Sequence, residues 1–193
     1  MAAPRIGVLA LQGDVEEHIR VLHSLGAESL AVKSRADLDA VAALIVPGGE
    51  STTVIRLLDR FEMAEPVRDR VRGGMPFWGT CMGMIVAAHD VAGLDQKTLD
   101  VLDVTVRRNA FGRQIASAEV PLAIPALGAD PFPGVFIRAP WVERAGSGVE
   151  VLATLDERPV FVRQGSVLGT SFHPELTNDV RLHAYFLRMI GSP

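Results

Sequence analysis

The chain has 193 residues, 48% of them hydrophobic, a formal net charge of −4 at pH 7 and one cysteine. It is long enough to bury a substantial core, and no apolar run approaches the ~18 residues of a transmembrane helix, so we expect no membrane partner. The acidic balance argues against nucleic acid as a partner, and one cysteine excludes an internal disulfide and a multi-cysteine metal site.

The first half of the chain alternates short apolar runs with amphipathic stretches. Ile6–Leu11 is the first predicted strand; it is too short for the apolar core of a signal peptide, so we expect a cytoplasmic protein. Asp14 is the predicted N-cap of the helix that follows, which Gly26 ends. Further along we expect strands over 29–32 and 43–46, a helical link over 37–41 and helices over 52–59 and 64–72. This alternation predicts a parallel sheet with helices on both faces.

The strand over 43–46 ends in Pro47-Gly48-Gly49-Glu50-Ser51-Thr52. Two glycines at a strand end adopt backbone conformations closed to other residues, so the amide of Gly49 can face a ligand and stabilise an oxyanion. Glu50 and Ser51 can hold the polar groups of a small substrate. In the alternative interpretation this is a plain strand-to-helix turn, capped by Ser51 or Thr52. It is not a phosphate loop, because the spaced glycines and the trailing lysine are missing.

The only cysteine lies in Gly79-Thr80-Cys81-Met82-Gly83, between an apolar run over 75–78 and a predicted helix over 84–88. A glycine two residues to each side of a nucleophile, at a strand-to-helix junction, is the sequence form of a nucleophile elbow. The free amides at the helix start then favour the thiolate over the thiol. The alternative is that Cys81 is a small buried hydrophobic residue, but the paired glycines favour the elbow.

From residue 101 to residue 171 the chain is rich in β-forming runs, and its prolines leave little room for long helices. Predicted strands cover 104–107, 114–120, 135–138, 149–155, 160–164 and 167–171, and the closing helix covers 179–190. We expect residues 1–193 to form one α/β domain of three layers, a doubly wound, mostly parallel sheet with helices on both faces and some antiparallel strands in the second half. The glycine-rich strand ends at Gly48 and Gly79 should then meet in one crevice.

A catalytic cysteine needs a base, and His173 is the candidate. It follows a predicted strand and begins His173-Pro174-Glu175, in which the proline leaves the two flanking side chains on the same side. Glu175 can therefore set the tautomer of His173 while the other ring nitrogen faces the thiol. The alternative is a structural turn. The other histidines lie in predicted helical stretches, where an exposed or partly packed imidazole is usual: His18, His23, His89 and His183.

The three motifs, in this order, resemble those of the class I glutamine amidotransferases, whose triad is Cys-His-Glu. Segments 7–14, 47–53, 108–114, 135–140 and 171–177 extend the likeness, over essentially the whole chain, to the glutaminase subunits of pyridoxal 5'-phosphate synthase. The resemblance implies that Cys81 is the nucleophile and that His173 and Glu175 are its partners. It also implies a glutamine-binding set, which is Gly49, Glu50, Ser51, Arg108, Ile137 and Arg138. Met82 departs from the family pattern, in which alanine commonly follows the nucleophile.

What the resemblance implies for mechanism is hydrolysis of L-glutamine through a thioester on Cys81, with the oxyanion held by the amides of Gly49 and Met82. Arg108 or Arg138 would supply the cation for the substrate carboxylate. No metal or organic cofactor is required. The ammonia would pass to a separate (β/α)8-barrel synthase subunit that makes pyridoxal 5'-phosphate, and the glycine pair at 48–49 is the expected switch of the oxyanion site.

Three other interpretations remain. The chain could serve another ammonia-using synthase, such as that of imidazole glycerol phosphate, although segments 11–14 and 108–114 argue against it. It could be a catalytically silent interaction subunit of the same fold, although all three triad residues are present. A PfpI-like hydrolase also has a lone cysteine at an elbow, but its acid partner typically follows an early strand, which would leave the His-Pro-Glu pairing unexplained.

Overall fold

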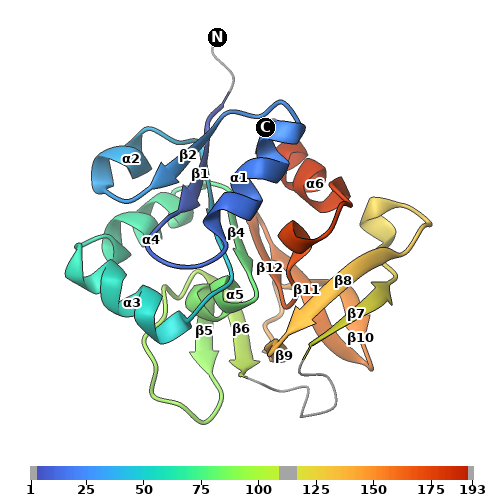
Figure 1. Cartoon of the computed structure of the whole chain (residues 1–193). Coiled ribbons are helices and arrows are strands. Elements are labelled where there is room, and N and C mark those ends of the chain that lie inside the picture. Colours follow the sequence, from blue (N-terminus) through green and yellow to red (C-terminus); the bar gives the residue numbers. More distant parts are fainter. Residues whose placement is uncertain (1–3, 109–116, 191–193) are drawn as a thin grey trace.

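A seven-stranded sheet forms the centre of the computed structural model, which describes residues 4–108 and 117–190 (Figure 1). The strand order is β10-β11-β12-β4-β3-β1-β2, and the five strands from β12 to β2 are parallel. The antiparallel strands β11 and β10 extend one edge. The bounds are β1 (Ile6–Leu9), β2 (Ser29–Val32), β3 (Ala43–Val46), β4 (Phe77–Thr80), β10 (Glu150–Leu155), β11 (Arg158–Gln164) and β12 (Val167–Thr170).

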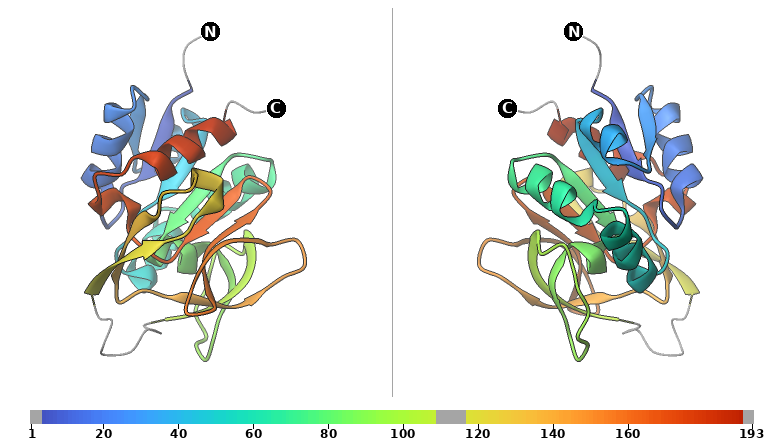
Figure 2. Two further views of the ribbon diagram at one scale, coloured as in Figure 1. Left: turned by 90° about the vertical axis from the view of Figure 1, so that its right-hand side faces the viewer. Right: turned by 90° about the vertical axis from the view of Figure 1, so that its left-hand side faces the viewer.

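Helices cover both faces of this sheet. The view at the left of Figure 2 has α6 (Arg181–Ile190) and the hairpin of β7 (Ser117–Leu122) and β8 (Phe132–Ile137) toward the reader, and the view at the right has α3 (Ser51–Arg60) and α4 (Ala64–Arg72). The other helical elements are α1 (Val15–Ser24), α2 (Arg35–Asp39), α5 (Met82–Ala87) and the 3₁₀ turns η2 (Pro125–Leu127) and η3 (Pro174–Leu176). A small sheet joins β5 (Ala88–Val91), β6 (Leu102–Arg107) and β9 (Trp141–Ala145).

Side chains along the central strands point alternately to the two faces of the sheet, which divides the buried interior into two hydrophobic cores. Leu44 and Phe77 belong to the core beneath α3, α4 and α5, whereas Ile45 and Trp78 belong to the core beneath α1, α6 and the hairpin. Successive side chains of a strand point to opposite faces of the sheet, so central strands need apolar residues at every position. This explains the unbroken apolar run of β3, where all four residues are buried.

The doubly wound α/β architecture predicted from the sequence is confirmed, and most of the predicted elements are present. The strands over 29–32 and 43–46 and the helix over 64–72 have the predicted bounds. Strands β5 and β9 were not predicted, and the closing helix begins at Arg181 instead of residue 179. The predicted strand over 114–120 corresponds to β7, and its first three residues lie outside the described part of the chain, as do residues 109–114 of the segment over 108–114.

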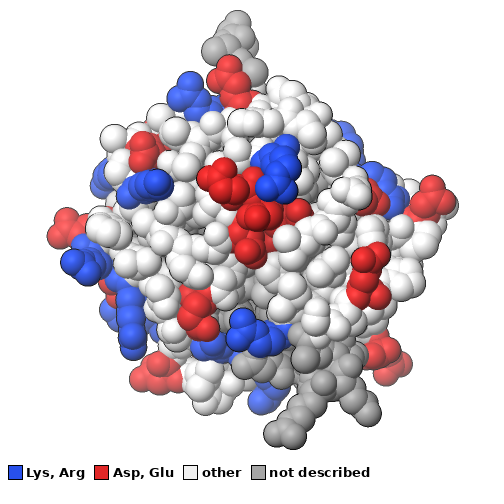
Figure 3. All heavy atoms as spheres, viewed as in Figure 1, with Lys and Arg blue, Asp and Glu red and all other residues white. Residues whose placement is uncertain are grey.

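The described helices include none that is both long and apolar enough to cross a membrane. On the face shown in Figure 3, acidic and basic side chains are interspersed among uncharged residues. Such a mixture is typical of a solvated surface.

Candidate active site

Cys81 lies in the predicted elbow between β4 and α5. Its backbone has φ of 49° and ψ of −108°, a strained conformation for a residue with a side chain, and its N–H donates to the carbonyl of Thr170 at 2.7 Å. The elbow is tight because α5 begins directly against β3. A Cβ atom on Gly83 would lie 1.9 Å from the backbone oxygen of Val46, so only glycine fits there.

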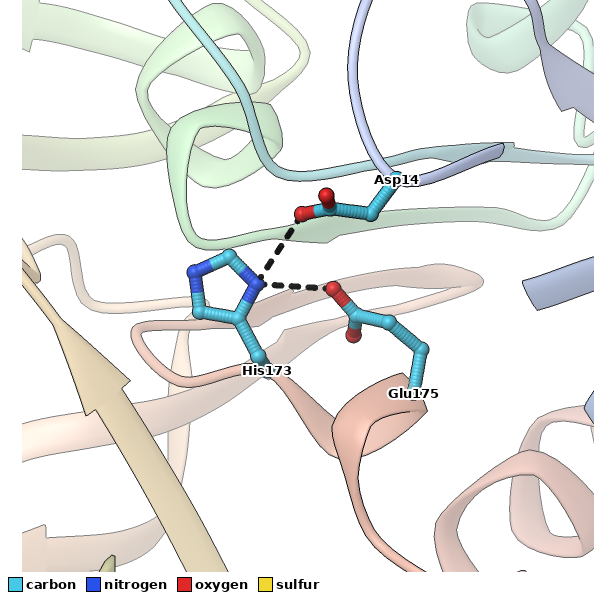
Figure 4. A group of neighbouring side chains, drawn as sticks. All are labelled: Asp14, His173 and Glu175. Atoms are coloured by element: carbon cyan, nitrogen blue, oxygen red, sulfur yellow. Dashed lines mark hydrogen bonds and ion pairs between the residues drawn. The ribbon is translucent and has the colours of Figure 1, made fainter. Parts of the chain in front are cut away.

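His173 and Glu175 are brought to the same end of the sheet by β12. This strand pairs with β4 in parallel, with Thr170 opposite Thr80, so the residues that follow the two strands leave the sheet side by side. The His173 N–H donates to the carbonyl of Val135 at 2.8 Å, which fixes the backbone there. The Nδ1 atom of His173 donates to Oε1 of Glu175 at 2.7 Å, as the sequence predicted (Figure 4).

A second carboxylate, that of Asp14, also contacts His173. Its Oδ2 lies 3.3 Å from Nδ1 of the imidazole, the same nitrogen that contacts Glu175 (Figure 4). The prediction that Asp14 caps α1 is wrong in its chemistry, because Asp14 stands at the N-cap position but its side chain makes no capping hydrogen bond. The second ring nitrogen, Nε2, points away from both carboxylates in Figure 4. Nδ1 is thus held by two acids, and neither of them contacts Nε2.

These contacts favour the charged form of the imidazole. Burial lowers the pKa of His173, but its interactions with Asp14, Cys81 and Glu175 outweigh burial and raise the pKa to about 12. Burial raises the pKa of Glu175, and the hydrogen bond from His173 opposes that increase. The carboxylates of Asp14 and Glu175 therefore favour an imidazolium at position 173 at neutral pH.

A pocket of about 270 Å³ opens at these residues. The predicted site residues that line it are Gly49, Glu50, Ser51, Cys81, Met82, Arg108, Ile137, Arg138 and His173. Glu175 is the exception, because it is buried behind His173. The lining also includes residues that the sequence did not single out as site residues: Asp14, Ile85, Pro140 and Leu176. A cavity of this size suits a single amino acid.

Polar side chains on one wall of the pocket form a connected network. Arg108 donates to Oε1 of Glu50 at 2.9 Å and to Oε1 of Gln96 at 3.2 Å, and Gln96 in turn donates to Oγ of Ser51 at 3.1 Å. Burial raises the pKa of Glu50, but Arg108 and Thr52 outweigh this and lower it. Gln96 gave no signal in the sequence, because it lies in an irregular stretch without a motif. The network fixes the Arg108 guanidinium at the pocket wall.

The glycine pair after β3 packs directly against the imidazole of His173. A Cβ atom on Gly48 would lie 2.4 Å from Cε1 of His173, so the absence of a side chain lets the imidazole approach this turn. The carbonyl of Gly48 accepts from the Asp14 N–H at 3.2 Å, and the Glu50 N–H donates to Oε1 of Gln12 at 2.7 Å. Residues 12–14, after β1, therefore hold the orientation of the peptides at 48–50.

The predictions for the remaining histidines are partly wrong. His23 and His89 are exposed as expected, although His89 lies in β5 and not in a helix. His18 in α1 and His183 in α6 are fully buried. Both rings lie against the indole of Trp78 between the two helices and the sheet, with centroids 5.9 Å and 4.9 Å from it.

Comparison with known proteins gives close and consistent matches. The model of the SNO glutamine amidotransferase family matches residues 8–192. Proteins named pyridoxal 5'-phosphate synthase subunit PdxT are similar over nearly their whole length: that of Moorella thermoacetica is 51% identical, over 97% of this chain and 100% of its own, and that of Salinispora tropica is 53% identical, over 100% and 99%.

Solved structures agree with these matches. A crystal structure described as a glutamine amidotransferase is 51% identical, with a TM-score of 0.91 over 97% of this chain and 99% of that chain. PurLQS from Thermotoga maritima has a TM-score of 0.70 at 17% identity, over 97% of this chain and 99% of that chain, which shows a shared fold alone.

Proposed function

The chain belongs to the SNO glutamine amidotransferase family, and from this membership we infer that it is the glutaminase subunit of a pyridoxal 5'-phosphate synthase, which hydrolyses L-glutamine to L-glutamate and ammonia. The observation that carries the assignment is the pairing of a strained cysteine elbow with a carboxylate-held imidazole at one pocket. We propose that Cys81, His173 and Glu175 are the catalytic triad.

In the first half of the proposed reaction, the Cys81 thiolate attacks the side-chain amide carbon of glutamine. Negative charge collects on the former carbonyl oxygen, where the amides of Gly49 and Met82 receive it. The imidazolium of His173 gives its Nε2 proton to the amide nitrogen, the C–N bond breaks and ammonia leaves. A glutamyl thioester on Cys81 and a neutral His173 remain.

The second half restores the resting site. The neutral imidazole takes a proton from water, and the resulting hydroxide attacks the thioester carbon. The C–S bond breaks, glutamate leaves, and the thiolate and imidazolium are regenerated. Glu175 stabilises the imidazolium at both ends of the cycle through its hydrogen bond to Nδ1. Asp14 adds a second negative charge at the same nitrogen.

Substrate recognition is proposed for the polar wall and for the loop after β8. The guanidinium of Arg108 is held by Glu50 and Gln96 at the pocket wall, where a fixed fork suits the carboxylate of an amino acid. Arg138 has a positive φ of 46° at the end of β8, and its neighbour Ile137 places a carbonyl 3.9 Å from Sγ of Cys81. Gly49, Glu50 and Ser51 complete the proposed binding set.

The ammonia is proposed to pass to a partner synthase subunit with a (β/α)8 barrel. Support comes from the relatives, whose name describes a synthase subunit, and from chemistry, because ammonia released into water at neutral pH is protonated and no longer nucleophilic. We also propose that residues 1–193 act as one amidotransferase domain in the cytoplasm, where a reducing environment keeps Cys81 as a free thiol.

Glutamate release from glutamine, measured with and without the barrel subunit, tests this function. We expect weak release by the chain alone, stimulation by the barrel subunit and loss of release in Cys81→Ala. His23→Ala, which changes an exposed histidine, is the matched control and should keep full activity. Release that survives Cys81→Ala would refute the assigned nucleophile. Stimulation only by the synthase subunit of imidazole glycerol phosphate would assign the alternative partner.

A further inference from the structure

The second oxygen of the Glu175 carboxylate has no partner in the triad. Oε1 accepts from His173, whereas Oε2 is buried and has no hydrogen-bond partner among the described residues. A buried carboxylate oxygen without a donor is costly, and such an atom calls for an explanation. Among the described residues, a ring nitrogen of His18 approaches it, because Nε2 of His18 lies 3.4 Å from Oε2.

His18 is held in place from two other directions. Its Nε2 atom lies 3.2 Å from Oγ1 of Thr80, the residue before the nucleophile, and its Nδ1 atom lies 2.9 Å from Nε2 of His183. His18 comes from α1 and His183 from α6, so two helices place this pair on the buried side of the triad. The chain of contacts runs from His183 through His18 to Glu175 and His173.

Both histidines of this pair are neutral. Burial, followed by the nearby rings of His183 and His173, lowers the pKa of His18 well below its usual value. Burial lowers the pKa of His183 to about 3. A neutral imidazole carries one proton, so each ring donates through one nitrogen and accepts through the other.

Only one of the two possible proton arrangements suits the surroundings. If His183 donates from Nε2 to Nδ1 of His18, then His18 carries its proton on Nε2 and donates toward Thr80 and Oε2 of Glu175. In the reverse arrangement, a lone pair of His18 faces the carboxylate, and the proton of His183 lies on Nδ1, which has no acceptor in the described structure. The reverse arrangement is therefore the more costly one, because it leaves a buried N–H of His183 without an acceptor and turns a lone pair of His18 toward the carboxylate oxygen.

We propose that His18 is a positioning residue of the glutaminase, whose Nε2–H holds Oε2 of Glu175 so that Oε1 stays directed at His173, and that His183 fixes the required tautomer of His18. This inference rests on the proposed function for its catalytic meaning. It assigns a role to two buried polar side chains that lie on the far side of Glu175 from the pocket. A neutral donor suits this position, because it orients the carboxylate without competing with the imidazolium for its charge.

The tautomers can be measured directly by nitrogen NMR on the chain labelled with ¹⁵N-histidine. We expect His18 and His183 both to be protonated at Nε2, with resonances assigned from His18→Gln and His183→Leu. A proton on Nδ1 of His18 in the wild-type chain would overturn the proposal. This measurement needs no activity, so its result stands even if the chain fails to hydrolyse glutamine, which would refute the proposed function instead.

Kinetics of two matched variants test the positioning role. His18→Leu removes the donor, and we expect kcat to fall about 10- to 100-fold with an unchanged KM for glutamine. His18→Gln keeps an N–H at a similar distance from the backbone and should recover most of that loss. Equal losses in two variants that unfold at the same denaturant concentration would show a packing role only and overturn the proposal. If His18→Leu does not fold, the tautomers of the wild-type chain decide.

Discussion

Acid should destabilise this fold through two of its buried histidines, His18 and His183, and His183 offers a clear measurement. The ring is neutral and buried in the folded chain, where its pKa is about 3, but in the unfolded chain it takes a proton near its ordinary value of about 6.5. Between these values the unfolded state binds the extra proton, so the free energy of unfolding rises with pH and falls as the solution is acidified. His18 acts in the same direction.

The size of the effect follows from this difference in pKa. A solution at about pH 5 is roughly 1.5 units below the pKa of the ring in the unfolded chain. At 1.36 kcal/mol per unit, protonation of His183 alone therefore lowers the free energy of unfolding by about 2 kcal/mol relative to neutral pH. That loss is a substantial part of the 5 to 15 kcal/mol, roughly, that stabilises a typical domain. It corresponds to about a thirtyfold change in the folding equilibrium.

Urea unfolding followed by circular dichroism, at several values between about pH 7 and pH 5, measures this loss. His183→Leu removes the titrating group, so we expect its stability to depend less on pH than that of the wild-type chain, by about 2 kcal/mol over this range. His23→Ala removes an exposed histidine of α1 and should keep the wild-type dependence. An unchanged pH dependence in His183→Leu would refute the reasoning, because the buried ring would then titrate as it does in the unfolded chain.

Four further substitutions have expected outcomes. Gly83→Ala places a methyl group 1.9 Å from the carbonyl oxygen of Val46, and we expect a loss of about 3 kcal/mol and a melting temperature lower by at least about 6 °C in a thermal scan. Glu175→Gln should lower kcat on the order of 10³-fold and Asp14→Asn only about tenfold, because Glu175 is the acid closer to His173 and the more buried one. A larger effect of Asp14→Asn in steady-state kinetics would make Asp14 the acid of the triad. Arg108→Gln should raise the KM for glutamine about 10- to 100-fold with little change in kcat, and an unchanged KM would place the substrate carboxylate elsewhere.

The parts of the site that the sequence predicted are those with local signals. Glycines on both sides of Cys81 mark the elbow. A side chain at Gly79 would collide with the backbone of Gly83 within the turn, and one at Gly83 with the backbone of Val46 in the neighbouring strand β3. The pairing of His173 with Glu175 is also local, since the intervening proline fixes the relative direction of two nearby side chains. Central strands such as β3 were found because burial on both faces requires a continuous apolar run.

The parts that were missed depend on contacts between distant segments. Asp14 has the sequence position of a helix cap, and only the folded chain shows that the end of β12 brings His173 to it. His18 and His183 are 165 residues apart, and each looks like an ordinary helical histidine until α1 and α6 pack against Trp78. A helix carries polar residues toward the interior only where a partner from elsewhere in the chain satisfies them, and neither helix alone indicates that partner.

The position of β12 between β4 and β11 has a consequence for how the protein becomes active as it is made. Translation delivers Cys81 long before residues 167–175, so a nascent chain carries its sulfur before the proposed base His173 and the proposed acid Glu175 have been made. The gap in the sheet is filled only when β12 inserts, and the same insertion delivers His173 and Glu175. With the proposed triad, hydrolysis of glutamine would therefore begin only when β12 has closed the sheet.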